Sequence, residues 1–229
     1  MSKVLTAQET TAVLHRILEA VEKDQRRRWV EVACAIVLSL ATTASAWCAY
    51  QSTLWGGVQL YRLVAAASAS RKASELNITA LQHRAADASI GVTYLEAVFR
   101  GDKKLAEFLY GRFRPELKTA VDAWLKTDPM NNPDAPRSPF KMAEYVQQEL
   151  LDAKHQNDLA AQQQAAAQSA NETSDNYVLL TVLFASVLFF GGIGGTFQSS
   201  RLRNVVFVIA LLLFAVTLAA LGTLPICNE

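Results

Sequence analysis

Three long apolar segments interrupt a chain that is otherwise of mixed polarity. They cover residues 29–50, 177–197 and 205–224. Each holds about 20 residues, which is the length that an α-helix needs to cross a hydrocarbon core of about 30 Å. The third segment contains no charged residue. This pattern predicts an all-α membrane protein with three transmembrane helices.

The remaining segments complete the predicted layout. Residues 1–28 precede the first helix, and residues 6–24 repeat apolar side chains at helical spacing, which predicts an amphipathic helix. Residues 198–204 form a short loop, and residues 225–229 form a tail. The long middle segment, residues 51–176, is the only candidate for a separate domain.

Residues 51–176 predict a domain built on two long helices. Residues 58–100 contain no proline and form the first helix, and residues 139–170 form the second. Both contain alanine-rich stretches, so their backbones can approach closely. We expect an antiparallel, coiled-coil-like pair outside the cytoplasm. A disordered alanine- and glutamine-rich linker over residues 160–175 is the alternative.

Two shorter helices are predicted between the long ones. Asp102 is the expected N-cap of a helix that ends at Phe113, and Pro115 begins another that ends near Lys126. Their large apolar side chains predict the core of the domain, namely Leu105, Phe108, Leu109, Phe113, Leu117, Val121, Trp124 and Leu125.

Basic residues predict the orientation. Arg26 to Arg28 abut the first apolar segment, and Arg201 and Arg203 lie between the second and third segments. Lys and Arg beside short loops mark the cytoplasmic side. The N-terminus and the loop 198–204 are therefore predicted inside, and the middle segment and the C-terminal tail outside.

The first apolar segment also permits a second interpretation. An arginine cluster, an apolar run and the small residues Ala44-Ser45-Ala46 are typical of a secretory signal that is cleaved before Trp47. The stretch of residues before the apolar run is long for a secretory signal, which favours a permanent anchor.

The cysteines leave two alternatives open. Cys34 and Cys48 lie in or at the edge of the first segment, and Cys227 lies in the tail. Cys48 and Cys227 fall on the predicted outer side, where a disulfide is chemically possible. The simpler interpretation is that Cys34 and Cys48 fill space as small apolar side chains and that Cys227 is a free thiol. No CxxC or Cys/His cluster offers zinc ligands.

Glu31 is an acidic residue within the first apolar segment. Arg27 and Arg28 precede it on the same predicted helix at the spacing of neighbours, so an interfacial ion pair is the first interpretation. A cation-coordinating or proton-carrying role is the alternative, because charges in a membrane are costly and often functional.

Small residues predict where helices meet. Ser39, Thr42, Thr43 and Ala46 form a weakly polar stripe on the first helix, which either packs against other helices or lines a pore in an oligomer. Near the end of the second helix, glycine spacing predicts close helix packing, with a hinge as the alternative. The two glycines are Gly191 and Gly195.

Aromatic residues and glutamines mark the outer end of the first helix, at Trp47, Tyr50, Gln51, Trp55 and Gln59. Aromatic rings prefer the headgroup level, which accounts for the rings better than for the glutamines. The spacing resembles a Trp-x-x-Tyr-Gln-x-x-x-Trp-x-x-x-Gln signature in a family of uncharacterised bacterial inner-membrane proteins, and the stretch from Ser138 to Tyr145 is similar to theirs. The resemblance implies a bacterial inner-membrane location and no particular activity.

The sequence contains no recognisable catalytic constellation. His15, His83 and His155 are far apart, and there is no nucleophile elbow, phosphate loop or HExxH motif. A net charge of +1 gives no bulk attraction to nucleic acid. We expect a non-enzymatic protein without cofactor or metal that contacts membrane lipid, forms a homo-oligomer and presents its helical domain to an unknown protein partner. The alternative is a small homo-oligomeric ion channel lined by the first helix.

Overall fold

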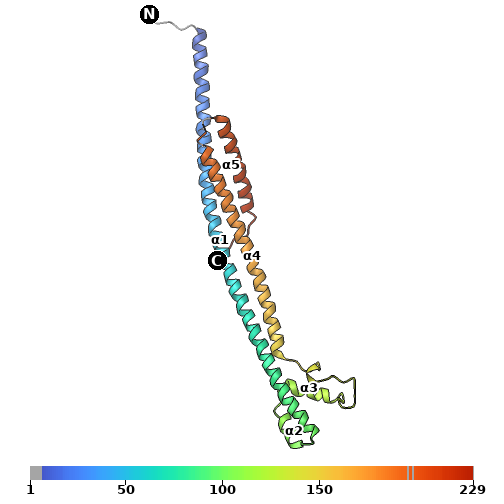
Figure 1. The fold of residues 1–229 in the computed structure, drawn as a ribbon. Coiled ribbons are helices and arrows are strands. Elements are labelled where there is room, and N and C mark those ends of the chain that lie inside the picture. The colour runs from blue at the N-terminus through green and yellow to red at the C-terminus, as the bar shows by residue number, and fades with distance from the viewer. Residues whose placement is uncertain (1–6, 195, 198, 229) are drawn as a thin grey trace. The chain divides into compact units, whose positions relative to one another are not determined.

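The computed structural model describes residues 7–194, 196–197 and 199–228. Within residues 7–27 it describes the backbone, with side chains only at His15, Leu18, Val21 and Gln25. All regular structure in these described residues is helical, which confirms the all-α prediction (Figure 1). The elements are α1 (Ala7–Phe99), α2 (Lys103–Tyr110), α3 (Pro115–Leu125), the 3-10 turn η1 (Pro139–Lys141), α4 (Gln148–Gly194) and α5 (Ser200–Leu221).

Three of these helices are long and apolar enough to cross a membrane. They are α1 from Arg28 onward, α4, and α5 from Arg201 onward. In lipid no water is present to bond with the backbone, so each spanning segment must satisfy its own N–H and C=O groups. An unbroken α-helix does so. The first apolar segment lies wholly inside α1, and the second and third lie inside α4 and α5 up to the ends of these helices at Gly194 and Leu221.

The chain divides into two compact units. The first, here called the three-helix unit, contains the residues up to Leu60 and those from Gln168 onward. The second, here called the hairpin unit, contains Tyr61–Ala167. Each unit has its own core and is described separately.

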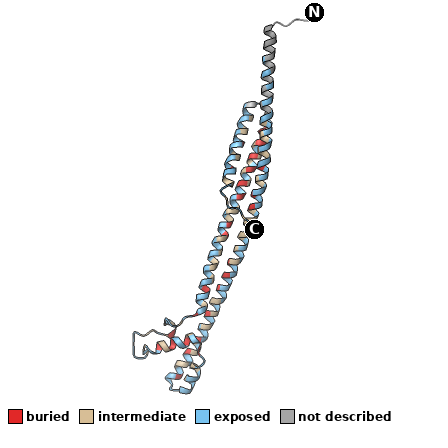
Figure 2. Cartoon of the chain, turned by 180° about the vertical axis from the view of Figure 1, so that it is seen from behind, coloured by how far each residue is buried: buried red, intermediate tan, exposed pale blue. Residues whose placement is uncertain are grey.

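In the three-helix unit, α1, α4 and α5 lie side by side (Figures 1 and 2). Phe184 of α4 and Phe214 of α5 are in ring contact, with centroids 6.0 Å apart. Gly191 lies so close to α1 that an added Cβ would come within 2.6 Å of Leu38 Cδ2. The buried core consists of Ala41, Cys48, Tyr177, Leu180, Phe184 and Val187.

In the hairpin unit, α1 and α4 pack through alanines. The guanidinium of Arg62 donates to Gln163 Oε1 at 3.0 Å, which joins the two helices. Because alanine side chains are short, the helix backbones can approach closely. Residues 160–175 lie within α4, so the alternative of a disordered linker there is wrong. The buried alanines are Ala66, Ala69, Ala73, Ala80, Ala97, Ala153 and Ala167.

Two predicted helix boundaries are wrong. Helix α2 ends at Tyr110 rather than at Phe113. Pro139 begins only a 3-10 turn, Met142 is extended, and α4 begins at Gln148. Tertiary contacts explain the second difference. The Gln147 side chain donates to the carbonyl of Ala80 at 2.8 Å, and Tyr145 packs edge-on against Phe140, and these contacts hold the segment before α4 in a non-helical conformation.

The predicted core of this unit is only partly right. Phe113, Leu117 and Val121 form the buried cluster, and Trp124 is buried as well. In contrast, Leu105, Phe108 and Leu125 are exposed. The cluster is completed by partly buried side chains that the prediction did not include, namely Ile90, Tyr94, Tyr110, Phe140 and Tyr145.

The predicted amphipathic helix at residues 6–24 is helical from Ala7 and continues into the first apolar segment as part of α1. Thr6, the first residue of the predicted helix, and most side chains of this helix lie outside the described residues. Its amphipathic character therefore stays a prediction.

The contact between Gly191 and Leu38 generates a test. Gly191→Ala should destabilise the three-helix unit by about 1–3 kcal/mol, because an added methyl overpacks the contact with α1. It should lower the thermal unfolding midpoint of the detergent-solubilised protein, and Leu38→Ala in the same chain should restore it. Gly192→Ala is the matched control, since a Cβ there meets nothing within 4 Å. Equal midpoints for the two glycine variants would contradict the contact.

Candidate functional site

Six ionisable or polar side chains meet inside the hairpin unit, around the guanidinium of Arg114. Arg114 is the N-cap residue of α3, so its position is set by the turn between α2 and α3. The remaining members come from α1, α3, the start of α4 and, in the case of Tyr145, the segment just before α4. We call this group the Arg114 cluster, consisting of His83, Asp87, Arg114, Glu116, Tyr145 and Glu149.

Arg114 binds three carboxylates at once. Its Nη1 lies 3.3 Å from Asp87 Oδ2 on α1. Its Nη2 lies 3.3 Å from Glu149 Oε1 on α4 and 3.4 Å from Glu116 Oε1 on α3. The planar guanidinium presents several donors in a fixed fork, which suits contacts to several partners. One side chain thereby connects three helices.

Asp87 is the buried anion of the cluster, with 2% of its surface exposed. Tyr145 donates its hydroxyl proton to Asp87 Oδ2 at 2.9 Å. Burial raises the pKa of Tyr145, and the hydrogen bond to Asp87 and its negative charge raise it further. Tyr145 is therefore a stable donor, and Asp87 receives two hydrogen bonds in place of water.

Glu149 is held in its ionised form. Its own backbone N–H lowers its pKa, and His83 and Arg114 lower it further against the opposing effect of burial. His83 Nδ1 lies 2.7 Å from Glu149 Oε1. In the described residues, Oε2 of Glu149 and Oε2 of Glu116 are buried without a hydrogen-bond partner.

This chemistry indicates a structural connection. Each carboxylate of the cluster contacts Arg114, which joins α1, α3 and α4. The cluster was missed in the sequence, because its members come in three pairs that are dozens of residues apart and form no motif. Asp87 in an alanine-rich helix was the available signal, since a buried charge requires a partner.

A second polar arrangement lies in the three-helix unit, where side chains of α1 and α4 hold the C-terminal tail. Trp55 Nε1 donates to the carbonyl of Pro225 at 3.1 Å, and the Tyr177 hydroxyl donates to the same carbonyl at 3.2 Å. The backbone N–H of Cys227 donates to Gln51 Oε1 at 2.9 Å. Gln51 is almost fully buried.

This arrangement explains part of the aromatic and glutamine motif. Gln51 and Trp55 bind the tail. This contact gives the two residues a role that anchoring at the headgroup level alone did not explain. Trp47 and Tyr50 are exposed, with ring centroids 5.9 Å apart, as rings at a membrane interface would be. Gln59 is half-buried.

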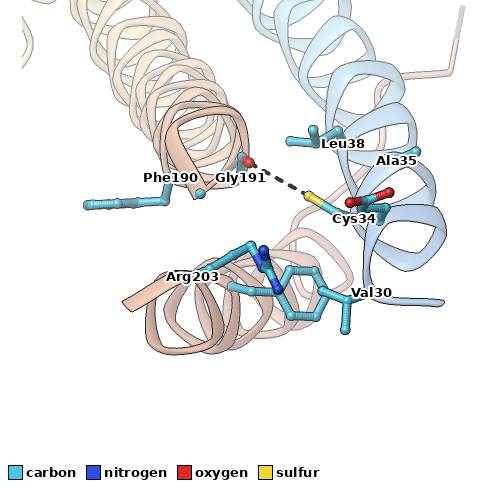
Figure 3. A pocket seen from close by; sticks show the side chains of 10 residues that line it. Val30, Cys34, Ala35, Leu38, Phe190, Gly191 and Arg203 are labelled. Carbon is cyan, nitrogen blue, oxygen red and sulfur yellow. Dashed lines mark hydrogen bonds between the residues drawn. The ribbon is translucent and has the colours of Figure 1, made fainter. Parts of the chain in front are cut away.

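A cavity of about 220 Å³ lies at the other end of the three-helix unit (Figure 3). The Cys34 thiol donates to the carbonyl of Gly191 at 3.6 Å beside it, and the Arg203 side chain extends from α5 into the space between the helices. Glu31 also lines the cavity, but most of the lining is apolar.

The small-residue stripe of α1 does not face α4 or α5. Ser39, Thr42, Thr43 and Ala46 are all exposed. The hydroxyls of Ser39, Thr42 and Thr43 donate to the carbonyls four residues earlier on their own helix, at 2.8, 2.8 and 3.1 Å. The stripe thus takes no part in packing within one chain.

The other predicted positions are placed as follows. Arg28 and Glu31 are exposed on α1, and the side chain of Arg27 lies outside the described residues, so the ion pair stays a prediction. Gly191 is buried against α1, whereas Gly195 lies outside the described residues.

Comparison with known proteins adds no identification, because no protein family, curated protein or solved structure matches the chain. The assignment therefore depends on the geometry described above.

The Arg114 cluster predicts a large effect of one substitution. Asp87→Ala should destabilise the hairpin unit by about 3 kcal/mol, because it leaves the partly buried Arg114 and the Tyr145 hydroxyl without their shared partner. Thermal unfolding followed by circular dichroism measures this loss. Glu96→Ala is the control on the same helix, since Glu96 and Arg100 form an exposed pair at 3.9 Å, and it should change the midpoint little. A small effect of Asp87→Ala would show that the cluster does not stabilise the unit.

The lowered pKa of Glu149 predicts a pH dependence. The folded state holds Glu149 ionised below its ordinary pKa of 4.5. The stability that it contributes is complete above this value and is lost as the pH falls through the lower folded-state pKa. Glu149→Gln should flatten the fall in unfolding midpoint below about pH 4.5, and Glu75→Gln on α1 should not. An unchanged slope in Glu149→Gln would contradict the assignment.

Proposed function

We propose that this chain is a non-enzymatic protein of the bacterial inner membrane that self-associates and presents its hairpin unit outside the cytoplasm. Three helices of sufficient length and apolar character support membrane insertion. Arginines before the first span and between the second and third support an N-terminus inside and a tail outside.

Helix α2 is the observation that carries the proposal. Its apolar residues lie on one side, as in a helix that covers a core, yet none of its residues is buried. Leu105 is 40% exposed and Phe108 is 56% exposed, and Phe99 at the end of α1 is 68% exposed. Large apolar side chains exposed on one helix face are typical of an interaction site in a soluble region, and the guanidinium of Arg112 lies over the Phe108 ring at 4.3 Å.

The rest of the hairpin unit holds α2 in place. Asp102 caps its first turn by accepting from the N–H of Leu105 at 3.1 Å. At its last turn, Tyr110 donates to Asp122 of α3 at 2.5 Å, and this bond, with burial and the charge of Asp122, raises the pKa of Tyr110 to about 12. The Arg114 cluster then joins α3 to α1 and α4. A surface supported in this way is preorganised for binding.

A second copy of the chain is the occupant that we propose for this surface. The exposed stripe of α1 has short side chains that would let another helix approach closely in lipid. Association through the stripe would hold two hairpin units near each other, which raises the effective concentration of α2 faces. Weak contacts between α2 helices would then suffice.

The channel alternative receives less support from the same stripe. Its hydroxyls already donate to carbonyls of their own helix, so they need no water-filled pathway. Packing of a helix from a second copy against the stripe accounts for its short side chains without a pore.

Substitution of the α2 face tests the proposal. Leu105→Gln with Phe108→Gln should weaken self-association in lipid nanodiscs by about tenfold, equivalent to about 1.4 kcal/mol, because apolar contact area is lost. Native mass spectrometry or cross-linking at several protein concentrations measures the change. The matched control is Leu81→Gln, which alters an exposed leucine of α1 in the same unit and should leave the association unchanged.

Two results would contradict the proposal. The first is a wild-type chain that stays monomeric in lipid at all concentrations tested. The second is ion flux through liposomes that is lost in Thr42→Leu and Thr43→Leu, which would support the channel instead.

A further inference from the structure

Two of the three cysteines, both with free thiols, lie at the end of the three-helix unit where the tail is held. Cys48 is fully buried in the core of this unit, together with Tyr177. Cys227 is half-buried and lies in the tail, whose described residues 225–228 have no regular secondary structure. No helix constrains the backbone around Cys227.

Hydrogen bonds bring the tail to the turn of α1 that carries Cys48. The N–H of Cys227 donates to Gln51 Oε1 at 2.9 Å. Gln51 follows Cys48 by three residues, and side chains at this spacing are neighbours on one helix face. Cys227 is therefore next to the helix face from which the Cys48 thiol emerges.

Two further contacts fix the approach of the tail from the side of α4. Trp55 and Tyr177 both donate to the Pro225 carbonyl, two residues before Cys227. Tyr177 also belongs, with Cys48, to the buried core of this unit. One tyrosine side chain thus joins the tail to the core that contains Cys48.

Cys34 is not a competing partner. It precedes Cys48 by fourteen residues, which is about 21 Å along α1 at the helical rise. A disulfide requires Cα atoms within about 7 Å. The Cys34 thiol instead contacts the Gly191 carbonyl at the other end of the unit.

We propose that Cys48 and Cys227 form a disulfide that covalently joins the C-terminal tail to α1. The inference rests on the orientation proposed above, which places both residues on the outer side of the membrane. That compartment is oxidising in bacteria, and structural disulfides persist there.

The chemistry is a thiol–disulfide exchange with a protein disulfide donor of that compartment. The more exposed Cys227, as thiolate, attacks the donor disulfide, and the donor releases one thiolate. Cys48 then loses its proton and attacks the mixed disulfide at the Cys227 sulfur, which releases the second donor thiolate. The two cysteines lose two electrons and two protons, and the donor disulfide gains them as two thiols.

Counting free thiols in cells tests the proposal. Cells are quenched with acid, the protein is denatured, and free thiols are labelled with polyethylene-glycol maleimide before or after reduction. Wild type should show one labelled thiol before reduction and three after it. Cys34→Ala should show none and then two, whereas Cys227→Ser and Cys48→Ala should each show two in both conditions.

A second arm uses purified protein in detergent with oxidised glutathione as the donor. Reduced wild type should lose two free thiols without forming a dimer, and Gln51→Leu should slow this closure severalfold, whereas Gln59→Leu should not. Thiols that stay free in both arms overturn the pairing. Three free thiols in cells, together with closure by oxidised glutathione, overturn instead the orientation on which the cellular disulfide depends.

Discussion

The fold depends on one constraint, which is that a backbone inside lipid must satisfy its own hydrogen bonds. No water is available in the hydrocarbon region, so each apolar segment has to be an unbroken helix. In this chain two of these helices continue far beyond the apolar residues, since α1 ends at Phe99 and α4 begins at Gln148. The same long helices therefore supply the walls of both compact units, and alanines let them pack closely where the sequence is no longer apolar.

Segments without regular structure are held in place by side-chain hydrogen bonds instead, and two buried polar side chains of α1 accept them. In the hairpin unit, buried Asp87 accepts from Arg114 and Tyr145, which fixes the start of α3 and the approach to α4. In the three-helix unit, buried Gln51 accepts from Cys227 and fixes the tail. Both are polar side chains in a helix face that is otherwise closely packed. A buried polar group without a partner is costly, so each position selects the one arrangement of loop or tail that satisfies it.

The candidate sites were accessible to sequence reasoning to different degrees. Gln51 and Trp55 were singled out because their spacing was conspicuous, but the tail that they bind is about 170 residues away in sequence, and no local pattern connects the two. The Arg114 cluster gave no local signal, since its carboxylates come from α1, α3 and α4. Leu105 and Phe108 were placed in the core by their apolar character alone. Their exposure could not be foreseen, because it depends on which face of α2 the neighbouring helices leave uncovered.

The sequence by itself determined the helical class, the three segments able to cross a membrane, the cap at Asp102, the start of a helix at Pro115 and the alanine faces of the long helices. These features follow from local periodicity, segment length and backbone chemistry, which act within a few turns. Only the tertiary structure decided that Pro139 begins a short turn rather than a helix, that the α1 stripe faces outward, and that Cys227 lies beside the turn of Cys48. These outcomes depend on side chains far apart in the chain, whose contacts are selected by burial and hydrogen-bond satisfaction rather than by local preference.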